Sequence, residues 1–228
     1  RCTTTSGRIR GQELEIRNGD GRHVKQGEPW LKWASELQSL AQAGLYYGKD
    51  KFDRERYARI REIAAEMMAR QTDLPLEQVK GWFCNETGYQ TPKLATRAAV
   101  FQGERILLVR EPKGWALPGG WVDVDVSVRE NVIKEVREEA GLEVRPDRVI
   151  ALQDGENHHE TLYPWKVCIV FVLCTLLGGE FRENLETSES GWFSLNELPE
   201  LDLEKTTPEQ LRMSFEARGA EHWETRLE

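Results

Sequence analysis

The chain has 228 residues, 39% hydrophobic and 31% charged, and these fractions suit a soluble protein with one core domain and a smaller additional part. Its formal net charge of −8 argues against a general nucleic-acid-binding protein, because contact with phosphate backbones requires a basic surface. The longest apolar run, residues 167–177, is shorter than the roughly 18 residues of a membrane-spanning helix and predicts a buried strand.

The cysteines and the N-terminal segment indicate the compartment. Cys2, Cys84, Cys168 and Cys174 show no CxxC spacing, so neither a zinc site nor a disulfide framework is predicted, and a reducing cytoplasm is the natural interpretation. Cys168 and Cys174 are six residues apart in a predicted strand and are expected on the same face as small buried side chains. Residues 1–28 are polar and lack the apolar core of a signal peptide, so we interpret them as a disordered tail or extension.

Residues 29–90 are predicted to form a small helical domain for packing or dimerisation. In the first helix the apolar residues recur at three- and four-residue spacing: Trp30, Trp33, Ala34, Leu37, Leu40 and Ala41. Asp53 is expected to cap a second helix, whose apolar stripe is Tyr57, Ile60, Ile63, Ala64, Met67 and Met68. A third helix is predicted over residues 75–83, with Pro75 in its first turn and its apolar side chains facing inward: Val79, Trp82 and Phe83.

After a turn-rich loop at residues 85–92, strands and helices alternate. Strands are predicted at residues 94–101, 105–109, 148–152, 165–176 and 192–193, the first two joined as a hairpin through Gln102 and Gly103. Helices are predicted at residues 128–140 and, after a cap at Thr207, at residues 208–215. This order predicts an α/β domain over residues 91–228, with a mixed sheet covered by helices.

The helix at residues 128–140 has clear end signals. Ser127 and Glu130 have the spacing of a capping box, and Gly141 suits the left-handed position that ends a helix. Its buried stripe is expected to consist of four aliphatic residues: Val128, Val132, Ile133 and Val136.

Three carboxylates on this helix are candidate metal ligands. Glu135, Glu138 and Glu139 stand at i, i+3 and i+4, which gathers them on one edge of the helix. Like charges at this spacing repel, and a Mg²⁺ ion, which prefers hard oxygen ligands, would convert that repulsion into affinity. The adjacent Gly119–Gly120 pair lets the backbone approach a ligand closely. On composition alone, the same run is also typical of a solvated helix face with ion pairs.

The full string from LPGG to the helix end resembles the Nudix signature. Gly120 opens the motif, and the matching positions are Glu135, Val136, Glu138, Glu139, Gly141 and Leu142. Three positions depart from it, with Asp125 in place of Gly, Val126 in place of Glu and Lys134 in place of Arg. The resemblance implies that Glu135 and Glu139 hold Mg²⁺, with Mn²⁺ as the alternative, and that Glu138 helps to bind metal or orient water. It also implies that Lys134 steadies the cluster and that the backbone of Gly119 and Gly120 borders metal and substrate.

Further segments, such as NETGYQTPK and ETSESGWFSLNELPEL, resemble an N-terminally extended Nudix branch that includes bacterial CDP-choline and ADP-ribose pyrophosphatase-like proteins. This resemblance implies a Nudix α/β/α sandwich with a mixed sheet, preceded by a small helical domain, in a homodimeric hydrolase. The implied substrate is a nucleoside diphosphate linked to another group. Two alternatives remain open at this point: a module that binds a nucleotide as a sensor without turnover, and an RNA-processing enzyme of the same fold.

Two loops hold further candidates. Glu186, with Glu183 and Glu189 as neighbours, lies where many Nudix enzymes carry a catalytic base or an additional metal ligand, although acidic loops are common without such a role. His158, followed by His159, is a candidate substrate contact, although paired loop histidines are usually only solvated.

Overall fold

The computed structural model describes residues 29–228 except residues 73, 160–164 and 183. The tail predicted at residues 1–28 and the candidate Glu183 therefore lie outside the described residues. The α-helices are α1 (Pro29–Tyr47), α2 (Lys51–Thr72), α3 (Leu76–Phe83), α4 (Val128–Ala140) and α5 (Pro208–Gly219). The strands are β1 (Lys93–Gln102), β2 (Arg105–Glu111), β3 (Gly114–Ala116), β4 (Leu142–Asp154), β5 (Val167–Gly179), β6 (Glu189–Phe193) and β7 (Arg226–Leu227). Within these residues, no helix combines the length and the apolar character that crossing a membrane requires.

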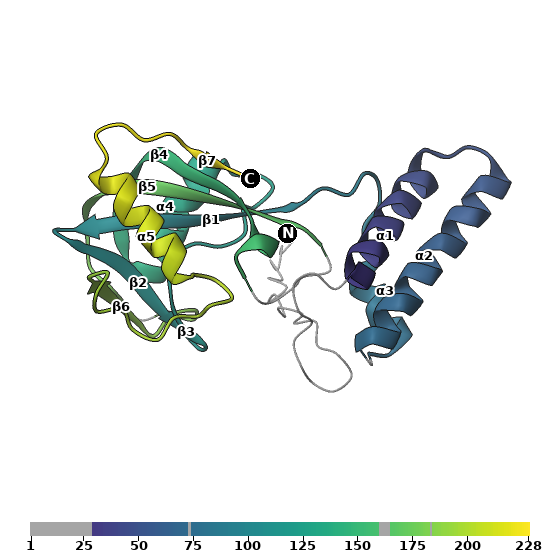
Figure 1. The fold of residues 1–228 in the computed structure, drawn as a ribbon, viewed down its shortest axis with the longest axis horizontal. Coiled ribbons are helices and arrows are strands. Elements are labelled where there is room, and N and C mark those ends of the chain that lie inside the picture. Colours follow the sequence, from purple (N-terminus) through teal and green to yellow (C-terminus); the bar gives the residue numbers. More distant parts are fainter. Residues whose placement is uncertain (1–28, 73, 160–164, 183) are drawn as a thin grey trace, which may run out of the picture.

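Helices α1, α2 and α3 form a separate helical unit beside the sheet (Figure 1). Its core is built from small and large apolar side chains of all three helices: Trp30, Leu31, Ala34, Ala64, Ala65, Met68, Val79 and Phe83. The predicted stripe of α1 is partly wrong, because Trp33 and Leu40 are 57% and 59% exposed. The packing face of α1 is rotated toward Ala34, Gln38 and Ala41, whose smaller side chains face the rest of the unit.

The start of α2 also differs from the sequence prediction. Oδ1 of Asp50 accepts hydrogen bonds from the backbone N–H groups of Phe52 and Asp53, at 2.9 and 3.0 Å. Asp50 is therefore the N-cap, and Asp53 lies in the first turn, where its carboxylate pairs with Arg56 at 2.6 Å. The choice between the two aspartates depends on where the helix begins, which the apolar stripe alone does not determine.

The sheet runs in the order β3-β2-β1-β5-β4-β7, with β6 also paired to β2. Strand β1 pairs with β5 in parallel and with β2 antiparallel, so the sheet is mixed, as predicted. Strand β4 extends well beyond the predicted residues 148–152, because it continues pairing with β5 across register shifts near Glu143 and Pro146. Strand β7, which adds two residues beside β4, was not predicted.

Each face of the sheet carries its own apolar layer. Alternate residues of β1 point to opposite faces: Ala95 and Ala99 belong to the layer that includes Leu211 of α5, and Ala98 and Val100 to the layer under α4. Helices α4 and α5 therefore cover opposite faces, which confirms the predicted α/β/α sandwich (Figure 1). Cys174 is buried in the α4 layer, whereas Cys168 is only half-buried.

We predict that Asp50→Ala lowers the free energy of unfolding by about 1 kcal/mol, because two backbone N–H groups of α2 lose their acceptor. Asp53→Ala is the matched control and should change it by less than about 0.5 kcal/mol, since an exposed ion pair contributes little. Urea denaturation followed by circular dichroism measures both changes. Equal effects of the two substitutions would contradict the assignment of the cap.

Candidate functional site

Helix α4 presents two acidic side chains at one place because both of its ends are fixed. The Oγ of Ser127 accepts a hydrogen bond from the N–H of Glu130, whose side chain accepts one from the N–H of Ser127, and Gly141 ends the helix at φ 66°. This confirms the predicted caps. Val132 and Val136 are buried against the sheet, so Glu135, on the neighbouring edge of the helix, is directed to the end of the sheet near β1.

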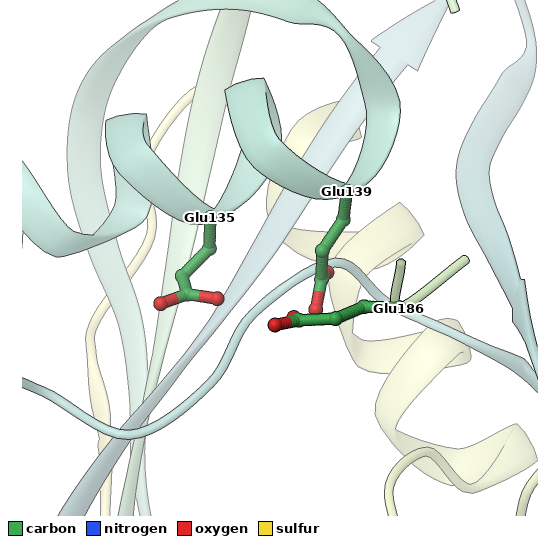
Figure 2. A group of neighbouring side chains, drawn as sticks. All are labelled: Glu135, Glu139 and Glu186. Carbon is green, nitrogen blue, oxygen red and sulfur yellow. The ribbon is translucent and has the colours of Figure 1, made fainter. Parts of the chain in front are cut away.

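Three carboxylates converge at this place (Figure 2). One oxygen each of Glu135, Glu139 and Glu186 lies within 4.8 Å of the others. Figure 2 shows Glu135 and Glu139 pointing the same way from successive turns of α4, with Glu186 reaching toward them from a separate segment. Glu135 and Glu139 are 7% and 5% exposed, whereas Glu186 is exposed. The structure thus brings together two of the three carboxylates singled out on the helix, and a loop supplies the third.

The loop before α4 passes close to this cluster at two glycines, Gly119 and Gly120. The N–H of Gly119 donates to Oε2 of Glu139 at 2.9 Å. A Cβ at Gly119 would lie 2.1 Å from the carbonyl oxygen of Thr96, and one at Gly120 would lie 2.8 Å from Oε2 of Glu135. Gly119 also has φ 150°, a conformation that L side chains rarely adopt. The glycine pair therefore brings the backbone into direct contact with both buried carboxylates.

Burial makes both carboxylates hard to ionise without a cation. Burial, and then the nearby charge of Glu111, raise the pKa of Glu139 to about 8 against the hydrogen bond from Gly119. Burial is also the main cause of the raised pKa of Glu135, which Lys134 opposes and Glu138 and Glu186 reinforce. A cluster of oxygen ligands with this charge fits a hard divalent cation such as Mg²⁺, which would supply the missing positive charge.

Lys134 is a basic side chain in contact with the cluster. Its Nζ lies 2.7 Å from Oδ2 of Asp123 and 3.4 Å from Oε1 of Glu135, and the pKa of Lys134 is raised, chiefly by the hydrogen bond to Asp123. Lys134 thus links the loop that follows Gly120 to the helix. Asp123 was not predicted as part of the site, because no motif or spacing pattern marks it.

The loop that carries Glu186 is fastened to the end of α4. Oγ1 of Thr187 donates to the carbonyl oxygen of Glu139 at 2.6 Å, and Nδ2 of Asn184 donates to the same oxygen at 3.3 Å. The side chain of Asn184 also accepts from the N–H groups of Glu186 and Thr187, each at 2.9 Å. Asn side chains commonly accept from the backbone N–H two residues on, so Asn184 is itself a sequence signal for such an Asx turn.

Other predicted residues have different surroundings. Glu138 is exposed and lies outside the group of three carboxylates, although its charge acts on Glu135 and Lys134. Glu189 begins β6 and lies 3.6 Å from the guanidinium of Arg110. His158 contacts the carboxylate of Glu228 at 2.7 Å, a contact that does not involve the cluster. The roles predicted for Glu138 and His158 therefore stay predictions.

Arg97, a buried group next to the site, was missed by the sequence analysis, because a single strand residue carries no spacing pattern. Arg97 of β1 is 8% exposed and donates from Nη1 to the carbonyl oxygen of Gly119. The N–H of the same glycine binds Glu139. His159 is 5% exposed and contacts the carbonyl oxygen of Leu203 at 3.0 Å; burial lowers its pKa to about 4, so its ring is neutral near pH 7.

Comparison with known proteins gives matches along the chain. A family model described as a UDP-X-like N-terminal oligomerisation domain matches residues 28–83, and a NUDIX domain model matches residues 91–214. A putative ADP-ribose pyrophosphatase, YjhB, of Bacillus subtilis is 37% identical over 85% of this chain and 94% of that protein.

Two solved structures are similar over the full length of the matched chain. One is an ADP-ribose pyrophosphatase from Streptococcus suis, with 56% identity over 60% of this chain and 100% of the other and a TM-score of 0.57. The second is a UDP-X diphosphatase, with 31% identity over 90% of this chain and 100% of the other and a TM-score of 0.57.

The raised pKa of Glu139 predicts how pH and metal act on stability. Between its ordinary pKa of 4.5 and its value of about 8, the folded metal-free protein keeps a proton that the unfolded chain has released. The free energy of unfolding should therefore fall as pH rises through this window. Added Mg²⁺ should raise the melting temperature more above about pH 8 than at about pH 6. Differential scanning calorimetry with EDTA or Mg²⁺ measures this.

Glu139→Gln should reduce both the pH slope and the gain from Mg²⁺, because the amide neither ionises nor binds the ion well, while Glu135 keeps its own raised pKa. Glu143→Gln, which changes an exposed carboxylate of β4, is the control and should keep both. A Mg²⁺ effect that survives in Glu139→Gln would exclude Glu139 as a ligand.

Proposed function

We propose that this chain, which belongs to the Nudix family, hydrolyses the diphosphate of a nucleoside diphosphate linked to another group, using Mg²⁺ held by Glu135, Glu139 and Glu186. The observation that carries the proposal is the convergence of these three carboxylates, two of them buried, against a glycine pair that no side chain blocks. Its family membership makes the chain a Nudix pyrophosphohydrolase.

The reaction that we propose is attack by water on one phosphorus atom. The bond from that phosphorus to the bridging oxygen breaks, and two phosphate monoesters leave. When bound, the divalent cation supplies charge neutralisation on the diphosphate and makes water more acidic. We assign Glu138, which is exposed beside the cluster, to orienting the attacking water and accepting its proton. Lys134 holds Glu135 and Asp123 in place, and the backbone at Gly119 and Gly120 borders the substrate.

The names of the relatives guide the choice of substrate. Two similar proteins carry the name ADP-ribose pyrophosphatase and one carries the name UDP-X diphosphatase. All three names describe a nucleoside diphosphate derivative, and we propose ADP-ribose first, followed by NDP-sugars and CDP-alcohols. Mn²⁺ is the alternative cation, since the same oxygen ligands accept it.

A sensor that binds such a compound without turnover is the second candidate. Asp125, Val126 and Lys134 favour it, because each departs from the family signature. Val126 is half-buried and lies outside the three-carboxylate cluster, so its lack of a carboxylate leaves that cluster unchanged. Turnover with products identified by mass separates the two candidates. The same assay on 5′-capped and 5′-diphosphorylated RNA covers the RNA-processing alternative.

We predict Mg²⁺-dependent hydrolysis of ADP-ribose or a related compound and a loss of roughly a hundredfold in turnover for Glu139→Gln, equivalent to about 3 kcal/mol. The amide keeps the shape of the side chain but removes its charge. Glu138→Gln should lower turnover about tenfold or more without changing the Mg²⁺ effect on melting, because we place Glu138 on water rather than on the ion.

Glu143→Gln again serves as the control and should retain full turnover. Binding of these compounds with no turnover in the unmodified protein would favour the sensor. Full activity in a folded Glu139→Gln variant would remove Glu139 from the mechanism.

We also propose that the chain forms a homodimer through α1 and α2. Trp33, Leu40 and Tyr47 recur every seven residues along α1 and are 57%, 59% and 62% exposed, and Phe52 and Ile63 of α2 are 55% and 37% exposed. A stripe of large exposed apolar side chains is typical of a surface that is covered in an assembly. The match of this region to an oligomerisation domain agrees with that interpretation.

Leu40→Lys should weaken the dimer at least tenfold, because it places a charge in the middle of the apolar stripe. Sedimentation velocity over a range of protein concentrations measures the association. Leu177→Lys, which alters an equally exposed leucine on β5, is the control and should leave the association unchanged. A monomeric unmodified protein would refute the proposed interface.

A further inference from the structure

Arg97 is a buried cation on the α5 side of the sheet. It stands on β1 between Ala95 and Ala99, which face α5, and it is 8% exposed. Its guanidinium donates from Nη1 to the carbonyl oxygens of Gly119 and Thr96 and from Nε to that of Lys205. Three backbone carbonyls from three segments therefore fix its position.

Its charge acts on the nearby Glu139, but no carboxylate accepts a hydrogen bond from its guanidinium within the described residues. Within the described part of the chain, the hydrogen-bond partners of Arg97 are these carbonyl groups, and no ion pair of its guanidinium is present. Burying a cation without a directly bonded anion is costly. An anion brought by a ligand would remove that cost.

One end of the guanidinium is available for such an anion. Nη2 makes none of the hydrogen bonds of Arg97, and this nitrogen atom is not fully buried. Solvent therefore reaches Nη2. A guanidinium whose other nitrogens are already held by carbonyls presents its remaining N–H groups in a fixed direction, which suits recognition of phosphate oxygens.

Arg97 and the carboxylate cluster share one residue of the glycine pair. The N–H of Gly119 binds Glu139, and the carbonyl oxygen of Gly119 accepts from Arg97. The cation and the metal-binding carboxylates thus flank the same short piece of backbone. A ligand with two linked anionic groups can reach both.

Several neutral polar side chains lie near Arg97. His159, whose ring is close enough for Arg97 to lower its pKa, lies 3.5 Å from Nε2 of Gln210. Gln210 in turn donates to Oε1 of Gln153 at 3.1 Å. Lys205, which accepts from Arg97 through its backbone, pairs its side chain with Glu111. This environment offers hydrogen bonds to a polar ligand and leaves the charge of Arg97 for the anion.

We infer that Arg97 forms a phosphoryl-binding subsite in which Nη2 binds oxygens of the phosphoryl group farther from the carboxylate cluster. The inference rests on the proposed diphosphate substrate, but it describes binding that takes place without a metal ion. Arg97 then has two functions: it supports the glycine pair through Nη1 and receives the substrate through Nη2.

Isothermal titration with inorganic pyrophosphate in the presence of EDTA tests this subsite, because no cation on the carboxylates then contributes to binding. The unmodified protein should bind pyrophosphate, and Arg97→Gln should weaken binding at least tenfold. Glu139→Gln should retain or improve it, since that carboxylate is not a partner of the anion. Arg105→Gln, at an exposed arginine of β2, is the matched control and should bind normally.

Arg97→Lys is the second variant, used if Arg97→Gln fails to fold. Lysine keeps the positive charge but lacks the planar guanidinium, so its pyrophosphate affinity should lie between those of the unmodified protein and Arg97→Gln. In the active enzyme, Arg97→Lys should raise the KM for substrate while leaving the Mg²⁺ concentration for half-activity unchanged, a result that a purely supporting role would not give. Wild-type pyrophosphate affinity in a folded Arg97→Gln protein would overturn the inference, as would the absence of metal-free binding in the unmodified protein. An enzyme that hydrolyses none of the substrates leaves this binding result intact, so the two proposals fail separately.

Discussion

Two carboxylates held one helical turn apart and shielded from water impose the main constraint on this structure. Glu135 adds to the difficulty of ionising Glu139, and burial makes each of them hard to charge on its own. The surrounding groups counter this repulsion: the N–H of Gly119 binds one carboxylate, and Nζ of Lys134 lies near the other. The capping box and the end of α4 at Gly141 keep the two side chains in register with these partners. A protein gains nothing in stability from such an arrangement unless a cation completes it.

The parts of this site that depend only on residues close together in the sequence were predictable. The caps of α4 lie within one turn of the residues that they bind, and the four-residue spacing of Glu135 and Glu139 places them on one edge of the helix. The exposure of Glu138 was not predictable, because neighbouring positions differ by about a quarter of a turn and the contacts with the sheet decide which one is buried. The same limit applies to the loops. Glu186 joins the cluster whereas Glu189 pairs with Arg110, and only the path of the chain separates these two glutamates.

The helical unit and the sheet meet through contacts that no periodic pattern in the sequence predicts. Trp82 of α3 lies with its ring centroid 6.4 Å from that of Trp165, which leads into β5, and Nε2 of Gln42 donates to the carbonyl oxygen of Gly88 at 3.1 Å. In Figure 1 the two parts are joined by the chain leading into β1, the strand that carries Arg97. Apolar periodicity predicted the existence of α1, but which of its faces is covered depends on partners that are remote in sequence. For that reason Trp33 and Leu40, which share the predicted stripe with the buried Ala34, are exposed in the single chain.

The attachment of the Glu186 loop to the end of α4 has a consequence for ion selection. Asn184 and Thr187 bind the carbonyl oxygen of Glu139, so the loop that carries Glu186, the third proposed ligand, is held beside α4 by bonds that do not involve an ion. Coordination then freezes few additional degrees of freedom, and the preorganised loop gives up less conformational entropy than a free one would. A ligand set whose spacing is fixed in advance cannot expand easily. If these carboxylates hold the ion, as we propose, the site would discriminate by ionic radius, in favour of small octahedral ions and against the larger Ca²⁺, which needs six to eight oxygens at longer distances.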